Sequence, residues 1–288
     1  MSGEHAGAEL RRRIAGGEVV VAPGVHDGLS ARLAARHGFS AVYVSGAATA
    51  AALGHPDMSV IGLQETAAAV RVAARASGRL VIADADTGFG GLAAVRNTAA
   101  ELSAAGAAAI HVEDQPFPRR CGYLTAEPAV EVGEMRLRLA AARAGAGEML
   151  VVARTDALLV EGIAAVIARA LAYREAGAEV VMVNGITAIE ELERIAAAVR
   201  GPLLYNVSGS DRAPALAEAD ARRLGVVIVI HPVHAARAAA AAADRYLRAL
   251  AAGAEVEAGL RMPFTDYMDL AGWADAEGFE RGLGEPEA

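Results

Sequence analysis

The chain has little cysteine, little proline and no basic tract, and each of these features excludes a class of protein. Its 288 residues include a single cysteine, Cys121, so an internal disulfide is impossible. Only 10 prolines accompany a hydrophobic content of 54%, which excludes a disordered chain and predicts a well-buried interior. The formal net charge is -8 and no Lys/Arg-rich stretch is present, so we expect no nucleic-acid partner.

Long hydrophobic runs and common cofactor motifs are also missing. The apolar stretch from Ala235 to Ala243 is interrupted by Arg237, far short of the roughly 20 residues that cross a bilayer. The first residues carry three consecutive arginines but no apolar core of the signal-peptide type, so we expect a cytoplasmic protein without membrane attachment. No HxH or HExxH spacing supports zinc, and the glycines at 88, 90 and 91 lack the GxGxxG order of a dinucleotide site.

What is present is a repeat: a short apolar run followed by a longer helical pattern rich in Ala, Leu and Arg. The eight runs are Val19 to Gly24, Ala41 to Gly46, Leu80 to Asp86, Ala109 to Asp114, Met149 to Asp156, Glu179 to Gly185, Pro202 to Ser208 and Val226 to Pro232. The helical segments include Gly28 to His37, Gln64 to Ala76, Leu92 to Ala105, Ile163 to Ala176, Ile189 to Val199 and His234 to Ala251. This alternation predicts a single α/β domain over residues 1–288, a (β/α)8 TIM barrel of strands buried on both faces.

The last part of the chain exceeds what one barrel needs. Residues 259–288 hold an apolar and aromatic set that includes Phe264, Tyr267, Trp273 and Phe279. We predict a helical C-terminal extension that packs against a neighbouring subunit and is swapped between subunits of a homo-oligomer, in a homotetramer built as a dimer of swapped dimers.

Polar residues gather where the apolar runs end, which is the catalytic face of a (β/α)8 barrel. They are Tyr43, Ser45 and Gly46; Asp84 and Asp86; His111, Glu113 and Asp114; Arg154 and Asp156; Asn184; and Asn206. Because side chains alternate along a strand, Asp84 and Asp86 should share one side with Glu113 on the next strand. Three converging carboxylates predict a divalent cation with oxygen ligands, the alternative being neutralisation by Arg154 and helix amino termini. Asp27, just before a helix, fits a structural N-cap.

The single cysteine lies in a loop directly after the fourth run, between two arginines and a glycine. Cationic neighbours favour the thiolate form of a cysteine, which suits Cys121 to proton transfer. Gly122 beside it would let the loop fold over a bound ligand as a lid. The alternative is an incidental surface cysteine.

Several stretches together carry a family resemblance. They are Pro23-Gly-Val-His-Asp-Gly-Leu-Ser-Ala31, Tyr43-Val-Ser-Gly46, Gly54-His-Pro-Asp57, Ala83-Asp-Ala-Asp-Thr-Gly-Phe-Gly90, His111-Val-Glu-Asp-Gln115, Arg119-Arg-Cys-Gly122, Ala153-Arg-Thr-Asp-Ala157 and Asn206. Along essentially its whole length the chain resembles the isocitrate lyase and phosphoenolpyruvate mutase superfamily.

The resemblance implies a 2-oxo acid or its enolate held on Mg²⁺, with Mn²⁺ as a substitute. The implied metal ligands are Asp84, Asp86, Glu113 and, in the outer shell, Asp57. The implied catalytic residues are Cys121, Tyr43 and Arg154. The implied substrate-binding residues are Ser45, Gly46, Ala47, Arg120, Gly122, Asn184 and Asn206.

Within the superfamily, the Arg119-Arg-Cys-Gly122 loop resembles that of the methylisocitrate and dimethylmalate lyases. It implies retro-aldol cleavage of a 2-hydroxy dicarboxylate or tricarboxylate to pyruvate or glyoxylate plus a dicarboxylate, with Cys121 protonating the leaving enolate. The alternatives are a phosphoenolpyruvate mutase or carboxyphosphonoenolpyruvate phosphonomutase, an oxaloacetate decarboxylase or phosphonopyruvate hydrolase, and a non-catalytic barrel that binds a 2-oxo acid.

Three departures from the lyase pattern favour a substrate other than that of an ordinary methylisocitrate lyase. Tyr123 replaces the histidine that usually follows the loop glycine, and Asn184 replaces the glutamate that usually ends the sixth strand. The stretch Ser210-Asp-Arg-Ala-Pro214 replaces a Gly-Lys-Thr-Pro-like segment after the seventh strand.

Overall fold

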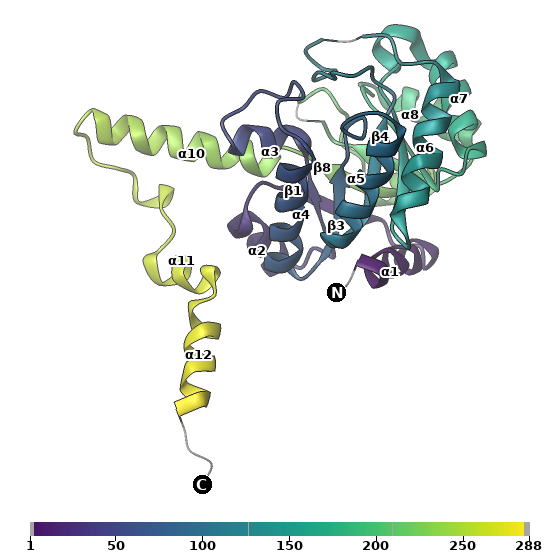
Figure 1. The fold of residues 1–288 in the computed structure, drawn as a ribbon. Coiled ribbons are helices and arrows are strands. Elements are labelled where there is room, and N and C mark those ends of the chain that lie inside the picture. Colours follow the sequence, from purple (N-terminus) through teal and green to yellow (C-terminus); the bar gives the residue numbers. More distant parts are fainter. Residues whose placement is uncertain (1–2, 126, 209, 285–288) are drawn as a thin grey trace. The chain divides into compact units, whose positions relative to one another are not determined.

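The structure is a computed structural model that describes residues 3–125, 127–208 and 210–284. Its elements in chain order are α1 (Gly3–Ala15), β1 (Val20–Val25), α2 (Gly28–Arg36), β2 (Ala41–Val44), α3 (Gly46–Ala52), α4 (Leu63–Ser77), β3 (Leu80–Asp84), α5 (Leu92–Ala104), β4 (Ala107–Glu113), α6 (Val132–Ala146), β5 (Leu150–Thr155), α7 (Leu158–Glu175), β6 (Val180–Val183), α8 (Ile189–Val199), β7 (Leu203–Asn206), α9 (Glu218–Arg223), β8 (Val226–His231), α10 (His234–Ala251), the 3-10 turn η1 (Ala258–Leu260), α11 (Phe264–Ala271) and α12 (Trp273–Gly284) (Figure 1).

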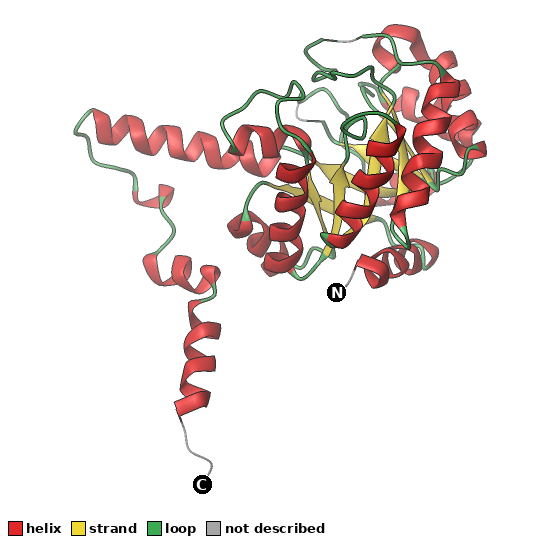
Figure 2. Cartoon of the chain, viewed as in Figure 1, coloured by secondary structure: helices red, strands yellow, loops and turns green. Residues whose placement is uncertain are grey.

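The eight strands form one closed parallel barrel. Each strand pairs in parallel with the next along the chain, and β8 pairs with β1 to close the sheet. Figure 2 shows the strands enclosed by helices. The predicted (β/α)8 barrel is confirmed, and every predicted strand agrees with the observed one within two residues at each end.

The strands read as nearly continuous apolar runs because both of their faces are buried. Ile82 and Val152 belong to the cluster inside the barrel, together with Met182 of β6. Their neighbours Val81 and Val151 belong instead to a cluster that packs between the sheet and the surrounding helices. Side chains therefore alternate between the interior and the helical layer along each strand.

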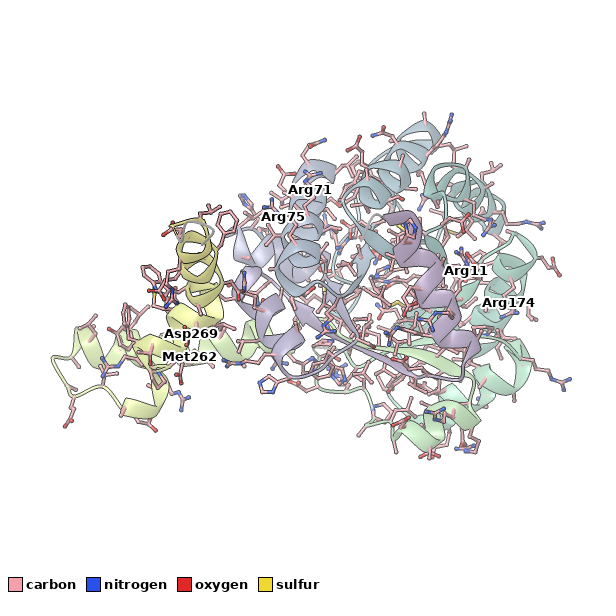
Figure 3. All side chains as sticks on the ribbon, turned by 90° about the horizontal axis from the view of Figure 1, so that it is seen from below. Arg11, Arg71, Arg75, Arg174, Met262 and Asp269 are labelled. Atoms are coloured by element: carbon pink, nitrogen blue, oxygen red, sulfur yellow. The ribbon has the colours of Figure 1, made fainter. Side chains whose placement is uncertain are left out.

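Helix α1 closes the amino-terminal end of the barrel. Leu10 is fully buried in the interior cluster, and Arg11 Nε lies 2.7 Å from Glu179 Oε2 just before β6. In Figure 3, seen from below, Arg11 is labelled on this helix. A side chain at Gly7 would place its Cβ 1.9 Å from the carbonyl oxygen of Glu148, so the helix packs directly on the backbone here. The opposite, carboxyl end of the barrel holds the candidate site.

The described residues divide into two compact units, one ending at His234 and one beginning at Ala235. The second unit contains most of α10, with η1, α11 and α12, so the tail is helical as predicted from residue 259 onward. Residues 285–288 of the predicted extension lie outside the described residues. Large apolar side chains of this unit are exposed, among them Phe264 at 76% and Phe279 at 69%. No helix of the described chain has the length and apolar character to cross a membrane.

Candidate active site

The interior face of the barrel changes from apolar to polar toward the carboxyl ends of the strands. The inward-facing positions two residues apart are Ile82 and Asp84, Ala109 and His111, Val152 and Arg154, Met182 and Asn184, and Leu204 and Asn206. The period of two along a strand therefore directs the polar residues toward the same axis as the core beneath them. This is the physical reason why polar residues at the ends of apolar runs mark the site.

A cavity of about 440 Å³ opens at this end of the barrel. Its walls include Tyr43, Ser45, Ala47, Asp57, Asp84, Arg119, Cys121, Gly122, Tyr123, Arg154, Asn184 and Asn206, with Leu124, Leu159, Met182, Thr187, Ser210, Arg212, Pro232 and Val233 completing them. The size is in the range of a small-molecule pocket. Most side chains expected from the sequence lie here together.

The charged half of the pocket consists of Asp57, Asp84, Arg119 and Arg154 in its wall, together with Asp86, Glu113 and Asp156, which are ion-paired with these arginines. Arg119 lies among its carboxylates: Nη2 is 2.7 Å from Asp57 Oδ1, and Nε donates to Asp86 Oδ1 at 2.7 Å. The same guanidinium is 3.5 Å from Glu113 Oε1. The family resemblance implied substrate binding by the neighbouring Arg120 instead. Arg120 is exposed and is not part of the cavity wall, and its backbone N–H donates to Gln115 Oε1 at 3.3 Å.

Arg154 is held by two acidic residues. Its Nε and Nη2 donate to the two carboxylate oxygens of Asp156 at 2.7 and 2.9 Å, and Nη1 lies 3.0 Å from Glu113 Oε2. Glu113 is fully buried, yet neither of its carboxylate oxygens has a hydrogen bond of good geometry within the described residues. A buried carboxylate with free lone pairs is a strong candidate for a metal ligand.

Asp86 lies in the site because of a turn after β3, and strand alternation does not place it there. Strand β3 ends at Asp84, and Asp86 follows in a left-handed backbone conformation with φ 48°. Its N–H donates to Asp84 Oδ1 at 3.1 Å, so the turn brings both carboxylates together. The expectation that the two aspartates lie close holds, but the strand argument for it is wrong at Asp86.

The electrostatics of these carboxylates favour a bound cation. Burial raises the pKa of Asp86 to about 6, with Arg119 opposing the shift and Asp84 adding to it. Burial also raises the pKa of Glu113 well above its usual value, against the two arginines. Both carboxylates therefore lose their protons at a higher pH than usual, and a bound cation would favour their ionised forms.

Tyr43, His111 and Asp84 form a buried chain beside this cluster. The Tyr43 hydroxyl is 2.6 Å from His111 Nε2, and His111 Nδ1 is 3.4 Å from Asp84 Oδ1. Burial lowers the pKa of His111 to about 4 and raises that of Tyr43 well above its usual value, so both side chains are neutral near pH 7. Burial opposes ionisation of Asp84 too, but the charge of His111, which is protonated at low pH, and the charges of Arg154 and Arg119 outweigh burial and hold the pKa of Asp84 below its usual range.

The first turn of α3 forms the wall next to Asp84. Ser45 caps this helix by accepting from the Ala48 N–H at 3.4 Å, and the Gly46 N–H donates to Asp84 Oδ2 at 3.3 Å. A Cβ at Gly46 would lie 2.9 Å from the guanidinium of Arg119 and 3.0 Å from Asp86. A larger residue at position 46 would therefore have to displace charged side chains that pack closely against this turn.

Cys121 lies in the cysteine loop, defined as residues 116–125. Its side chain is half-buried and faces the cavity, and its N–H donates to the carbonyl of Asp57 at 3.2 Å. A Cβ at Gly122 would approach Asp156 Oδ1 to 3.0 Å, so the loop lies close over the floor of the site. Of the two arginines beside it in the sequence, Arg119 is ion-paired with carboxylates and Arg120 is exposed.

The amide half of the pocket consists of Tyr123, Asn184 and Asn206. The Tyr123 hydroxyl donates to Asn184 Oδ1 at 2.7 Å, and Asn206 Nδ2 donates to the same oxygen at 2.9 Å. Asn184 Nδ2 donates to Asp156 Oδ1 at 2.6 Å, which connects the two halves. Two of the three departures from the lyase pattern, Tyr123 and Asn184, are thus direct partners.

The predicted structural role of Asp27 is confirmed. Its carboxylate accepts from the Ser30 N–H at 2.7 Å, and the Ser30 hydroxyl accepts in return from the Asp27 N–H at 3.1 Å. This capping box begins α2 and lies outside the pocket wall.

The donor set fits a hard divalent cation, with one qualification that the geometry imposes. Asp84, Asp86 and Glu113 offer carboxylate oxygens, the ligands that Mg²⁺ prefers. In the described part of the chain, however, no three acidic, histidine or cysteine side chains already converge on one metal position. Arg119 lies between them, so a cation has to share or replace its contact with Asp86. Sequence reasoning missed this role of Arg119, although the residue begins the motif that carries the loop.

An acidic and arginine-rich site with a thiol loop, at the carboxyl end of a closed (β/α)8 barrel, defines an enzyme of the barrel class. A family model described as phosphoenolpyruvate phosphomutase matches residues 10–251. The chain belongs to this family, so the resemblance found in the sequence is confirmed.

Its relatives perform several related reactions. A 2-methylisocitrate lyase of Aeropyrum pernix is 38% identical over 281 residues, covering 95% of this chain and 90% of the relative. The structure of oxaloacetate acetylhydrolase in complex with the inhibitor 3,3-difluorooxalacetate has a TM-score of 0.90 at 32% identity, covering 98% of this chain and 99% of that one. Phosphonopyruvate hydrolase in complex with oxalate and Mg²⁺ has a TM-score of 0.85 at 28% identity, covering 98% and 99%. The chain is therefore an enzyme of a family that includes lyases.

Proposed function

We propose that this enzyme is a Mg²⁺-dependent lyase that cleaves a carbon–carbon bond of a 2-hydroxy dicarboxylate or tricarboxylate. The products are a 2-oxo acid, pyruvate or glyoxylate, and a dicarboxylate. The observation that carries the proposal is that Cys121 lines the same cavity as Asp84 and Arg154. A proton donor and a charge-stabilising site thus face one substrate-sized space.

The residues of the chain divide the reaction between them. The substrate hydroxyl loses its proton to a base, the carbon–carbon bond breaks, and the electron pair moves to the carbon of the leaving dicarboxylate. The Cys121 thiol donates its proton to that carbon. Arg154 and Asn206 hold carboxylate groups, while Tyr43, Ser45, Gly46 and Ala47 hold the 2-oxo acid.

The cation would be held by Asp84, Asp86 and Glu113, with Asp57 next to them. When bound, Mg²⁺ or Mn²⁺ polarises the oxygen of the forming 2-oxo acid. The Glu113 oxygens, which accept no hydrogen bond within the described residues, and the raised pKa of Asp86 support this assignment.

A reaction panel tests the proposal. The protein with Mg²⁺ is incubated with 2-methylisocitrate, 2,3-dimethylmalate, oxaloacetate and phosphonopyruvate, and pyruvate, glyoxylate and oxalate are measured. We expect cleavage of a hydroxy acid, and a loss of about 100- to 10,000-fold in kcat for Cys121→Ser, because a serine hydroxyl is a much weaker acid. Full activity of the serine variant would remove the thiol from the mechanism.

Oxaloacetate is the second candidate substrate. The structural similarity to an oxaloacetate acetylhydrolase, at a TM-score of 0.90 over nearly the whole chain, favours it. Hydrolysis of oxaloacetate without turnover of either hydroxy acid would replace the lyase proposal. Release of pyruvate from phosphonopyruvate would instead indicate phosphorus chemistry.

We further propose that the protein is a cytoplasmic homotetramer in which C-terminal helices are exchanged between subunits. The exposed Phe264, Trp273 and Phe279 of the second unit support it, because side chains of this size are rarely left in water. Sedimentation of the full chain should give a multiple of the 29.4 kDa protomer, and Trp273→Glu with Phe279→Glu should reduce it.

A further inference from the structure

The hydroxyl of Tyr123 connects the cysteine loop to two strands on the far side of the pocket. It donates to Asn184 Oδ1 at the end of β6 at 2.7 Å, and it accepts from Asn206 Nδ2 at the end of β7 at 3.4 Å. Burial raises the pKa of Tyr123, with nearby Ser208 and Arg154 opposing the shift, so the group remains a phenol that can donate. One side chain thus joins the loop to both strands.

The other flank of the loop is attached to the charged half. Arg119 forms ion pairs with Asp57 and Asp86, and its carbonyl oxygen accepts from the Ser59 hydroxyl at 3.0 Å. Cys121 lies between these attachments, two residues after Arg119 and two before Tyr123, with its own N–H bonded to the Asp57 carbonyl. The loop is therefore attached on both sides of the thiol by two anchors, which are the Arg119 contacts on one side and the Tyr123 hydroxyl on the other.

The two anchors differ in the number of groups that form them. The Arg119 side has several ion pairs and backbone bonds, so the loss of one leaves others. On the side of β6 and β7, among the described residues, the side-chain hydrogen bonds of the cysteine loop are all made by the Tyr123 hydroxyl. Removing one oxygen atom therefore releases that side.

We propose that Tyr123 is a positioning residue: by bridging the cysteine loop to Asn184 and Asn206, it holds the Cys121 thiol over the pocket. The consequence for catalysis rests on the proposed role of Cys121 as proton donor. The positioning itself does not, because the accessibility of a thiol can be measured without substrate.

Because Cys121 is the only cysteine of the chain, its alkylation by iodoacetamide reports on this loop alone. For Tyr123→Phe we expect the alkylation rate to rise about five- to tenfold, the scale of one buried hydrogen bond. The alkylation rate should rise by the same factor at every pH. A change in the acidity of the thiol would instead move the pH dependence of the rate along the pH axis. With substrate, kcat should fall more than KM changes.

Tyr205→Phe is the matched control. It also removes a phenol hydroxyl from this side of the barrel, but that hydroxyl donates to the Pro214 carbonyl at 2.8 Å and Tyr205 is not part of the pocket wall. Its alkylation rate should stay within about twofold of the parent. Asn184→Ala removes the acceptor from the opposite side and should reproduce the effect of Tyr123→Phe, which covers the case in which the tyrosine variant does not fold.

The outcomes separate the two proposals. Faster alkylation in a protein whose parent cleaves none of the panel substrates supports the positioning role and counts against the lyase. An alkylation rate within twofold of the parent in both Tyr123→Phe and Asn184→Ala overturns the positioning role, whatever the activity.

Discussion

The two halves of the pocket differ in their charge. The charged half has five carboxylates, Asp57, Asp84, Asp86, Glu113 and Asp156, against the two guanidinium groups of Arg119 and Arg154, and two oxygens of Glu113 remain without hydrogen bonds. The amide half has no formal charge, and its phenol and amides bond mainly to one another.

This difference in charge indicates that the two halves have different roles. The charged half has an excess of buried negative charge, which a divalent cation can offset. Most hydrogen bonds of the amide half join its own members, although Asn206 Oδ1 has no partner among the described residues, so this half contributes mainly shape and the placement of the loop. Changes in the first half should therefore alter charge balance, and changes in the second should alter geometry.

The largest effect is expected when the charged half loses Arg119. In Arg119→Met, three carboxylates lose a buried partner, and the free energy of unfolding should fall by about 3–5 kcal/mol near neutral pH without added metal. Urea unfolding measures it, and Mg²⁺ should restore part of the loss. The adjacent Arg120→Gln is the matched control, because its exposed side chain should change stability by less than about 0.5 kcal/mol. Equal stability of both variants would contradict the picture of Arg119 as the internal counter-charge.

A smaller effect is expected when the amide half receives a charge. Asn184→Asp keeps the shape but places a carboxylate where Nδ2 now donates to Asp156 Oδ1, at a cost of about 1–3 kcal/mol. The new carboxyl should have a raised folded pKa beside Asp156, so stability falls as pH rises through that value and recovers as pH drops. Unfolding at pH 5.5 and pH 8 measures this slope. Asn97→Asp, at an exposed position of α5, is the control and should show little of this slope.

The contrast between the halves also marks what the sequence could predict. The barrel followed from eight apolar runs, because buried parallel strands allow few other arrangements. Asp84, Arg154 and Asn184 followed from the same periodicity, since each continues the inward face of its strand two residues beyond a core position. The side-chain direction of a residue at the end of a regular strand can therefore be predicted from the residues before it.

Loop residues obey no such period. Asp86 lies after the strand with a positive φ, and Arg119 rather than Arg120 turns inward because of the path of the cysteine loop. The contact between Tyr123 and Asn184 spans 61 residues, and no local pattern connects them. The sequence assigns these residues to the site only through motif similarity. Such similarity does not predict which partner each side chain contacts.

The smallest expected effect is a pH dependence of metal binding that only the charged half should show. The pKa of Asp86 is raised to about 6 in the metal-free protein, so its carboxylate is mostly protonated at pH 5 and mostly ionised at pH 7. A cation must displace that proton, so the association constant for Mg²⁺ should rise about tenfold over this interval. Titration calorimetry in buffers of different ionisation enthalpy measures both the constant and the proton released. In Asp86→Asn the affinity should be weaker and its dependence on pH much flatter. If the parent bound Mg²⁺ equally well at both pH values, Asp86 would be a partner of Arg119 alone, and the cation would have to be assigned to Asp84 and Glu113.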